Sequence, residues 1–522
     1  MKPHRVPSWT RAGAAVGTAL LVLLASGCAT YSDQISSTSS ATKAGGLNSA
    51  LTEVERHAEK AKGGKDEIIW RLEQGAALRT AALADLPLPP PAPVKVKAGE
   101  PAPEPAPLPT PEEVRAIYFK RAIAAFDLAD ERISRYDEEA KVKVGSEIGA
   151  ALTNQASLPY RGRTYDKIMA NAYKGISYLQ LGEKDKARVE FNRSMERQRE
   201  AVELNARRIA EAQQVAEDAR TGKAKTDDGK SAAYDVDKAM ADPKTGGALQ
   251  AALESSIAGM KPYGDYVNPF AVFLDGLFFS VNGENGADWE RGRKSLERVA
   301  QLAPENPYVA ADLELATRAA EGQAPEGITY VIFETGTAPA RDQLRVDVPT
   351  FLVTSRLAYV GAAFPKLKFN DDYVPSLTVT TGEQSYPTAP VASMDSIVAN
   401  EFKNEWPTIV TKTLVTTATK AIAQAVVQKQ LDDRVGGWGS LIGAVAMTAL
   451  NSSTNIADTR TWTSLPKEFQ YARIPTPADR QITITAGGVT QSITLAPGSV
   501  NVVYAKSSSR SAPLYVSQFA LR

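Results

Sequence analysis

The chain has 522 residues, in which 60 Lys and Arg are balanced by 60 Asp and Glu, with one cysteine and two histidines. The length exceeds what one hydrophobic core usually organises, so we expect two or three domains. The neutral balance gives no indication of a nucleic-acid partner, for which a basic patch is the first sign. With so few His and Cys residues, Ser-His-Asp catalysis, Cys-His catalysis and a His-rich metal site are all disfavoured. We therefore expect no metal and no cofactor.

The first residues have the layout of a secretory signal. Basic residues precede a largely apolar run, residues 14–24, which is too short to span a bilayer because a span needs ~20 residues. Small residues then lead to Cys28, the single cysteine. The sequence LASG (24–27) before Cys28 resembles the lipobox of bacterial lipoproteins, although Ala25 stands where leucine is commoner. The alternative is an ordinary signal peptide with an incidental cysteine.

The lipobox resemblance implies cleavage after residue 27 and acylation of Cys28, including palmitate. Ala29, rather than aspartate, follows Cys28, which by the sorting rules of enteric bacteria implies the periplasmic face of the outer membrane. Residues 28–46 are small and polar, so we expect a lipidated flexible tether. Once the signal is removed, only His57 remains, in a charged helical stretch where we expect an exposed side chain.

Residues 169–198 carry the most informative helical pattern. A small residue, an aromatic residue three positions later, a glycine at the turn and then Ala, aromatic and small residues resemble a tetratricopeptide repeat (TPR). Gly175 and Ala187 should let two antiparallel helices approach closely, with Phe191 filling the space beside them. Gly182 should take the turn conformation that side chains with a Cβ resist.

Two further stretches match the same pattern. One is 269–304, and the other is split into two helices by the proline-rich segment 86–113, which we interpret as a long loop within one hairpin rather than a tether between domains. The three matches predict a TPR-like helical-hairpin solenoid over 47–325. Within it, the polar stretch 221–247 predicts a mobile loop.

After Gly327 the hydrophobic period changes to two, which indicates strands. We expect a β-sandwich-like domain over 327–522 with a helical insertion at 391–453. The pair Gly487-Gly488 between two apolar runs is typical of a two-residue hairpin turn. Within the insertion, Gly439 and Gly443 have the GxxxG spacing of membrane helices, but the run is too short to span, so a buried helix is favoured. The fold class is therefore multidomain α + β.

Two segments, ALTNQASLPYRGRTYDKIMANAYKGISYLQLG (151–182) and ADTRTWTSLPKEFQYARI (457–474), resemble a family of bacterial TPR-containing outer-membrane lipoproteins. The resemblance covers most of residues 110–510, and the proline-rich loop departs from it. The family has no assigned enzymatic activity, so the resemblance implies architecture more than mechanism.

The first-helix positions that would face a TPR groove are apolar, which is unlike a peptide-carboxylate clamp built from Lys, Arg and Asn. Either the groove binds a hydrophobic segment of a partner, or another part of this chain fills it. We favour the second, because large exposed apolar patches are unusual on stable monomers. The groove positions are Met169, Ile176, Leu179, Phe270, Phe273 and Leu277.

A second candidate site is Asp458, Arg460 and Trp462. The charged pair could bind a sugar or a peptide stem, with the indole as a stacking platform. The alternative, which we favour, is a fixed corner in which a salt bridge and a buried indole lock the helical insertion to the strands.

These features favour a non-enzymatic, periplasm-facing outer-membrane lipoprotein that acts as a protein-interaction scaffold for an envelope protein partner. By analogy with lipoproteins that activate penicillin-binding proteins, it would assist peptidoglycan synthesis. One alternative is a peptidoglycan-binding or glycan-acting protein with paired carboxylates. Another is a structural subunit of an envelope or surface assembly.

Overall fold

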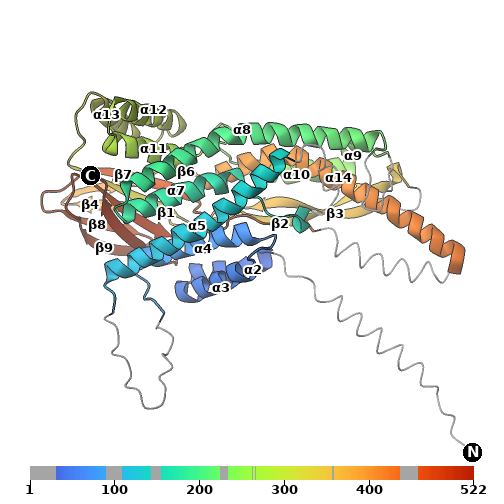
Figure 1. The fold of residues 1–522 in the computed structure, drawn as a ribbon, viewed down its shortest axis with the longest axis horizontal. Helices are drawn as coiled ribbons and strands as arrows, with labels where there is room; N and C mark the ends of the chain where they lie inside the picture. The colour runs from blue at the N-terminus through green and yellow to red at the C-terminus, as the bar shows by residue number, and fades with distance from the viewer. Residues whose placement is uncertain are drawn as a thin grey trace, which may run out of the picture.

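The computed structural model describes residues 31–89, 108–142, 155–223, 233–261, 263–264, 266–354, 358–435 and 456–522. It is a mixed α+β structure in which most helices precede the strands in the chain (Figure 1). The exception is α14 (Met394–Val435), a long helix between two strands. The predicted signal peptide 1–27, Cys28, and the GxxxG glycines Gly439 and Gly443 lie outside the described residues.

Three helical hairpins follow one another along the chain. They are α4 (Glu67–Leu83) with α5 (Pro111–Val142), α7 (Thr164–Gln180) with α8 (Lys184–Arg220), and α11 (Pro269–Asn282) with α12 (Gly286–Leu302). The helices of each hairpin pack along one another, α5 packs against α7, and α8 packs against α11. The last helix of this part, α13 (Val309–Ala320), packs on α12. The proline-rich segment thus lies between two helices that contact each other.

Glycines allow the close approach within the hairpins. A Cβ atom placed on Gly175 would lie 2.5 Å from the ring of Phe191, and one on Gly75 would lie 2.4 Å from the ring of Phe126. Both separations are shorter than real Cβ contacts, so no larger residue fits without a shift. Gly182, between α7 and α8, has a φ of +75°. The predicted roles of Gly175 and Gly182 are confirmed.

The prediction of a flexible tether is wrong for the residues that form α2 (Tyr31–Lys43). This helix is followed by α3 (Leu47–Lys60), and Tyr31 and Ile35 are buried against the body. Tyr31, Ile35 and Thr38 recur at helical spacing and form the buried face of α2, which docks the helix although its composition is mostly small and polar.

Two other expectations are corrected in the helical part. His57 on α3 is buried, because its ring stacks on Trp70 with 4.3 Å between centroids. The mobile loop predicted over 221–247 is wrong for its second half, where α9 (Val236–Ala241) and the start of α10 (Pro243–Ile257) are helical. Aspartate side chains at 235 and 242 cap these helices, and such caps outweigh the polar composition.

The strands form a five-stranded sheet with the order β11-β10-β1-β7-β6, a four-stranded sheet with the order β5-β4-β8-β9, and the separate hairpin β2-β3. β1 is parallel to β10, and the other pairs are antiparallel. A short 3-10 turn, η1 (Gln155–Ser157), precedes α7, and another, η2 (Thr350–Leu352), follows β2. The strands are β1 (Ile328–Thr335), β2 (Ala340–Pro349), β3 (Tyr359–Lys368), β4 (Thr378–Thr381), β5 (Gln384–Pro387), β6 (Ala389–Ser393), β7 (Glu468–Pro475), β8 (Gln481–Ala486), β9 (Val489–Thr494), β10 (Val500–Ser507) and β11 (Tyr515–Ala520).

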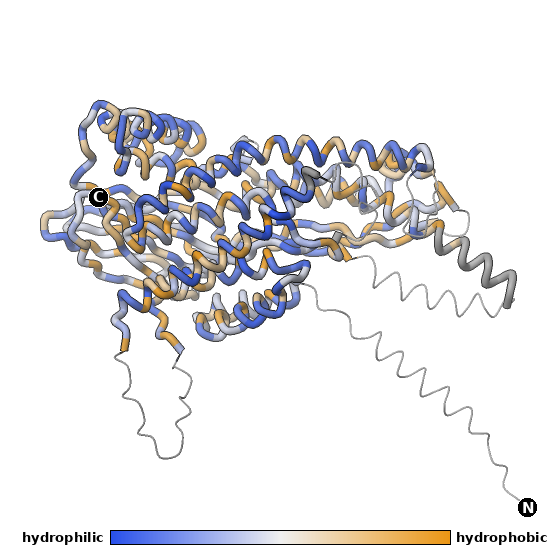
Figure 2. Tube along the Cα trace, viewed as in Figure 1, coloured by the Kyte–Doolittle hydropathy of each residue, from blue (hydrophilic) through white to orange (hydrophobic). Residues whose placement is uncertain are grey.

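The five-stranded sheet is the middle of three layers. One face packs on the four-stranded sheet, with Phe333 and Ile474 among the side chains of their shared core. The other face packs on the helical hairpins through stacked rings, and Phe270 lies 3.8 Å from Phe469 between centroids. Figure 2 shows the outer helix α8 as mostly hydrophilic, with hydrophobic residues gathered nearer the sheet. The two predicted domains therefore share one core.

Gly175→Ala should destabilise the protein by about 1–3 kcal/mol, because the added methyl group collides with Phe191. This loss should exceed the gain of about 1 kcal/mol that alanine usually brings to a helix interior. Chemical denaturation measures the free energy of unfolding. Gly247→Ala in α10 is the control, because nothing lies within 4 Å of its added Cβ, and it should be neutral or stabilising. Equal effects of the two substitutions would contradict the packing argument.

Candidate functional site

The predicted groove is filled by the chain's own sheet. Phe273 stacks on Tyr471 with 4.4 Å between ring centroids, and Phe270 stacks on Phe469. The idea of an open groove that binds a partner segment is therefore wrong, because strands β1 and β7 already cover it. None of the six predicted groove residues is more than 7% exposed: Met169, Ile176, Leu179, Phe270, Phe273 and Leu277.

A small apolar hollow remains at one end of this interface. It encloses about 300 Å³, including open solvent, between α7, α11 and strands β10 and β11. Ile176, Leu179 and Leu277 line it together with Tyr504 and Leu521. Its lining is almost entirely apolar, so it contains no arrangement of groups suited to chemistry.

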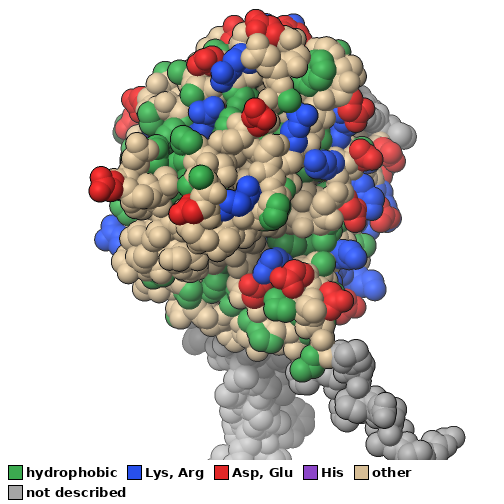
Figure 3. Space-filling model, turned by 90° about the vertical axis from the view of Figure 1, so that its left-hand side faces the viewer, with side chains coloured by type: hydrophobic (Ala, Val, Ile, Leu, Met, Phe, Trp, Pro, Cys, Tyr) green, Lys and Arg blue, Asp and Glu red, His purple; other side chains and the backbone are tan. Residues whose placement is uncertain are grey.

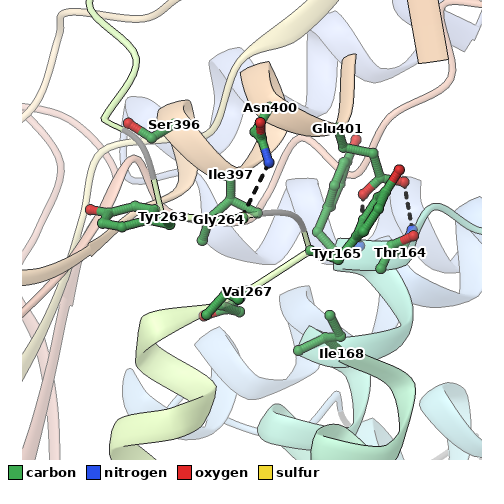
Figure 4. Close-up of a pocket in the computed structure, with 12 residues that line it drawn as sticks. Thr164, Tyr165, Ile168, Tyr263, Gly264, Val267, Ser396, Ile397, Asn400 and Glu401 are labelled. Carbon is green, nitrogen blue, oxygen red and sulfur yellow. Dashed lines mark hydrogen bonds between the residues drawn. The ribbon is translucent and has the colours of Figure 1, made fainter. Parts of the chain in front are cut away.

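A second hollow lies where α14 meets the start of α7 (Figure 4). It encloses about 310 Å³, including open solvent, and is lined by residues of α7, of α14 and of the segment that precedes α11. Several of its polar side chains are bonded within the chain, whereas the buried hydroxyl of Tyr266 has no hydrogen-bond partner among the described residues. Asn400 donates to the carbonyl of Gly264 (3.3 Å), and Ser396 accepts from the amide of Lys261 (2.9 Å).

Glu401 is the most distinctive group of this hollow. Its two carboxylate oxygens accept from the backbone amides of Thr164 (2.8 Å) and Tyr165 (3.2 Å), as Figure 4 shows. These amides are the first of α7, where a helix has unpaired donors and a positive dipole end. A helix N-terminus is a general anion site, and here a carboxylate from another part of the same chain occupies it.

Glu405 lies one turn after Glu401 on the same face of α14. Its carboxylate is 3.0 Å from Arg341 of β2 and is also paired with Arg163, which precedes α7. Arg208 of α8 lies 3.7 Å away. These contacts join four elements at one carboxylate, whose side chain is 12% exposed.

The environments of these carboxylates move their pKa values in opposite directions. Burial and then the neighbouring charge of Glu405 raise the pKa of Glu401. Burial also raises the pKa of Glu405, but Arg163 and Arg341 outweigh it and bring that pKa to about 2. Burial raises the pKa of Asp166, in the first turn of α7, to about 7, although Tyr160 donates a hydrogen bond to it.

A pair of carboxylates with separated pKa values can serve acid and base chemistry. Here, however, Glu401 is 3% exposed and its carboxylate is occupied by the amides of α7. The arrangement is suited to fixing α14 against α7, β2 and α8.

The second predicted site, Asp458, Arg460 and Trp462, is a fixed corner. Arg460 binds Asp458 (2.8 Å) and Asp66 at the start of α4 (2.9 Å). Trp462 is fully buried, its Nε1 donates to Ser464, and its ring lies 5.7 Å from that of Tyr173. No ring face is left for a sugar, so the proposed glycan contact is wrong. The corner holds the segment before β7 against α4 and α7, rather than against the helical insertion.

Sequence reasoning missed a second set of buried charges that tie the helices to the sheet. Glu334 of β1 accepts from Lys506 (2.9 Å) and from Arg79 of α4 (3.4 Å). Asp312 of α13 accepts from the hydroxyls of Tyr330 and Tyr471, both at 2.7 Å. The sequence did contain one sign of Glu334, because an acidic residue stands inside a largely apolar strand. All eight residues of that strand, Glu334 included, are buried.

Among the described residues, no cluster of three or more His, Cys, Asp or Glu side chains has a geometry that could hold a metal ion. Within the same part of the chain, no helix combines the length and apolar character that a membrane crossing needs.

Comparisons with protein-family models, with curated proteins and with solved structures found no match to this chain. The resemblance to TPR-containing lipoproteins therefore stays a prediction from sequence segments.

Glu405→Gln should lower the free energy of unfolding at pH 7 by about 3–5 kcal/mol, because it leaves Arg163 and Arg341 buried without their carboxylate. The pKa of Glu405 is lowered on folding from 4.5 to about 2. Its stabilising contribution is therefore present above pH ~4.5 and lost as the pH falls toward 2. Chemical denaturation of both proteins across this range measures the difference.

The control is Glu217→Gln on α8, where an exposed carboxylate pairs with Arg220 three residues later. Exposed pairs contribute little, so we expect no measurable change. A loss for Glu405→Gln that is the same at pH 3 and at pH 7 would contradict the assigned role.

Proposed function

We propose that the protein is a non-enzymatic, lipid-anchored scaffold on the periplasmic face of the outer membrane that binds an envelope protein partner through its outer helical surface. The observation that carries this proposal is that the candidate sites in the interior of the protein are occupied by the chain itself. The predicted groove, the corner at Arg460 and the carboxylates of α14 are all engaged within the chain. Recognition of a partner is therefore left to the exterior.

We further propose that the three hairpins are TPR-like units. In support, each has a close glycine contact between its two helices, as at Gly75 and Gly175, and consecutive hairpins pack on one another. The first helix of each hairpin faces inward and the second faces outward. In this chain the inward surface is covered by a sheet, which is why the outer helices carry the proposed partner site.

The outer helices α5 and α8 carry exposed apolar side chains. Of the eight large hydrophobic residues that are exposed in the described part of the chain, five lie on these two helices. They are Ile117 and Leu128 on α5, and Val189, Val202 and Ile209 on α8. The end of the molecule that carries the four-stranded sheet shows hydrophobic side chains together with interspersed positive and negative ones (Figure 3). The apolar positions suit a protein partner better than a polyanion.

A glycan-acting enzyme has one observation in its favour, the separated pKa values of Glu401 and Glu405. Both carboxylates are engaged, one by backbone amides and the other by arginines. We therefore prefer the scaffold.

Cys28→Ala should abolish the incorporation of labelled palmitate into the protein in growing cells, because the proposed acceptor sulfur is removed. Membrane fractionation and mass spectrometry of the N-terminal peptide provide the readout. Ser26→Ala is the control, because it keeps a small residue in the lipobox and should leave labelling intact. Labelling that persists in Cys28→Ala, or a wild-type protein that is never labelled, would overturn the anchor.

A photo-crosslinking amino acid at Val202 or Leu128 should capture a discrete envelope protein in living cells, because both side chains lie on the proposed partner surface. Mass spectrometry identifies the adduct. The matched control is Val489, which is 40% exposed and belongs to β9 of the four-stranded sheet rather than to α5 or α8. The same adducts at all three positions, or none at Val202 and Leu128, would count against the scaffold.

A further inference from the structure

The four-stranded sheet ends in a strand whose outer edge is open. β9 is joined to β8 by the two-residue turn Gly487-Gly488, and both glycines have positive φ angles, as a type I′ turn requires. The residues that flank this turn, Ala486 and Val489, form a hydrogen-bonded pair between the two strands. Because backbone groups alternate in direction along a strand, those of Thr490 and Ser492 point away from β8.

The contacts around β9 agree with this assignment. The carbonyl of Thr494, two residues after Ser492, accepts from the side chain of Gln518 on β11 (2.8 Å) and so also points away from β8. Within the described chain, no hydrogen bond reaches the outward amides and carbonyls of Thr490 and Ser492, and no helix packs along β9. Both residues are exposed. The edge therefore presents two backbone donors and two backbone acceptors to solvent.

Other strands of the described chain show how this fold protects an edge. β6 contains Pro390, its register shifts next to that residue, and the side chain of Asn306 donates to its carbonyls at 3.1 Å. On β2, the carbonyl of Arg341 accepts from Ser32 of α2 (3.3 Å). β9 has no proline, no charged residue and no shift of register. An edge without these devices is a template for another strand.

A second copy of this chain fits this edge. Two copies of β9 can pair antiparallel about a twofold axis at Gln491, and Thr490 of each copy then lies opposite Ser492 of the other. The outward backbone groups of both residues are then all paired, in four hydrogen bonds. Because β9 carries no charged residue, self-pairing brings no like charges together along the strand.

The side chains of this arrangement also match. Thr490 already makes a hydroxyl pair across β8 and β9, since its Oγ1 atom lies 3.1 Å from that of Thr485. Opposed Thr and Ser hydroxyls on neighbouring strands hydrogen-bond to each other. Thr490 of one copy and Ser492 of the other would continue the same kind of contact across the twofold axis.

We infer that the outer edge of β9 is a self-association site, at which a second copy of this chain adds its own β9 antiparallel. The two four-stranded sheets then become one sheet of eight strands. This inference goes beyond the proposed function, because the edge lies on neither α5 nor α8. A contact between two six-residue strands is smaller than a permanent interface, so we expect reversible association.

Sedimentation velocity on the full chain, purified in mild detergent, measures this association. We expect a sedimentation coefficient that rises with protein concentration toward that of a dimer. Thr490→Lys combined with Ser492→Lys places lysines opposite one another and should weaken the association about tenfold or more. Thr490→Lys combined with Ser492→Glu places a lysine opposite a glutamate and should restore it.

The matched control is Gln384→Lys combined with Ser385→Lys on β5, at the other edge of the same sheet, where both residues are exposed. This control should associate like the unchanged protein, and thermal melting establishes that every variant is folded. A chain that stays monomeric at all concentrations would overturn the inference, as would association that the paired lysines leave unchanged. Loss of association in the lysine–glutamate variant as well would exclude the antiparallel register and also overturn it.

Discussion

The central strand β1 must be covered on both faces, and the rest of the structure depends on that constraint. All eight residues of β1 are buried, which requires apolar cover above and below the sheet. The four-stranded sheet supplies one cover, and the inner helices α7 and α11 supply the other. The groove that the helical hairpins would otherwise present to solvent is therefore covered by the sheet. The helical and strand parts are therefore halves of one core.

Buried carboxylates specify how the two halves meet. Glu334 links β1 to α4, Asp312 links α13 to β1 and β7, and Glu405 links α14 to the start of α7 and to β2. Burying a charge costs several kcal/mol unless it is well paired, so these contacts are weak evidence for added stability. Apolar surfaces can slide over one another with little penalty, whereas each of these carboxylates is satisfied in one arrangement.

The features that could be predicted from the sequence are those with a local pattern. The spacing of Gly175 and Phe191 predicts their contact because both lie in one hairpin, and Gly487 and Gly488 both have the positive φ values of the predicted turn. The change to a hydrophobic period of two after Gly327 likewise predicts that the strands lie in this part of the chain. The predicted helical insertion begins too early, because residues 391–393 belong to the strand β6 and α14 begins at Met394; so short a strand shows no clear period.

Features that depend on distant partners could not be predicted in this way. The polar composition of α2 predicted a tether, and only its contacts with Glu73 and Thr461 explain why it is ordered. His57 lies in a charged stretch, yet Trp70 covers its ring. The role of Glu401 depends on the amides of α7, more than 230 residues away in the chain. Apolar positions show that a surface is buried, but they do not show which surface covers it.

The parallel pairing of β1 with β10 has a consequence for how the protein folds. β1 ends at residue 335 and β10 begins at residue 500, so the centre of the sheet closes only after nearly the whole chain is available. The hydrogen bond from the Tyr31 hydroxyl to the carbonyl of Thr461 likewise joins residues that are 430 positions apart. Contacts between distant residues slow folding, because a long loop must be ordered before they form. A chain that emerges from its N-terminus must hold the inner faces of α7 and α11 uncovered until its last strands arrive, and it is exposed to aggregation throughout that interval.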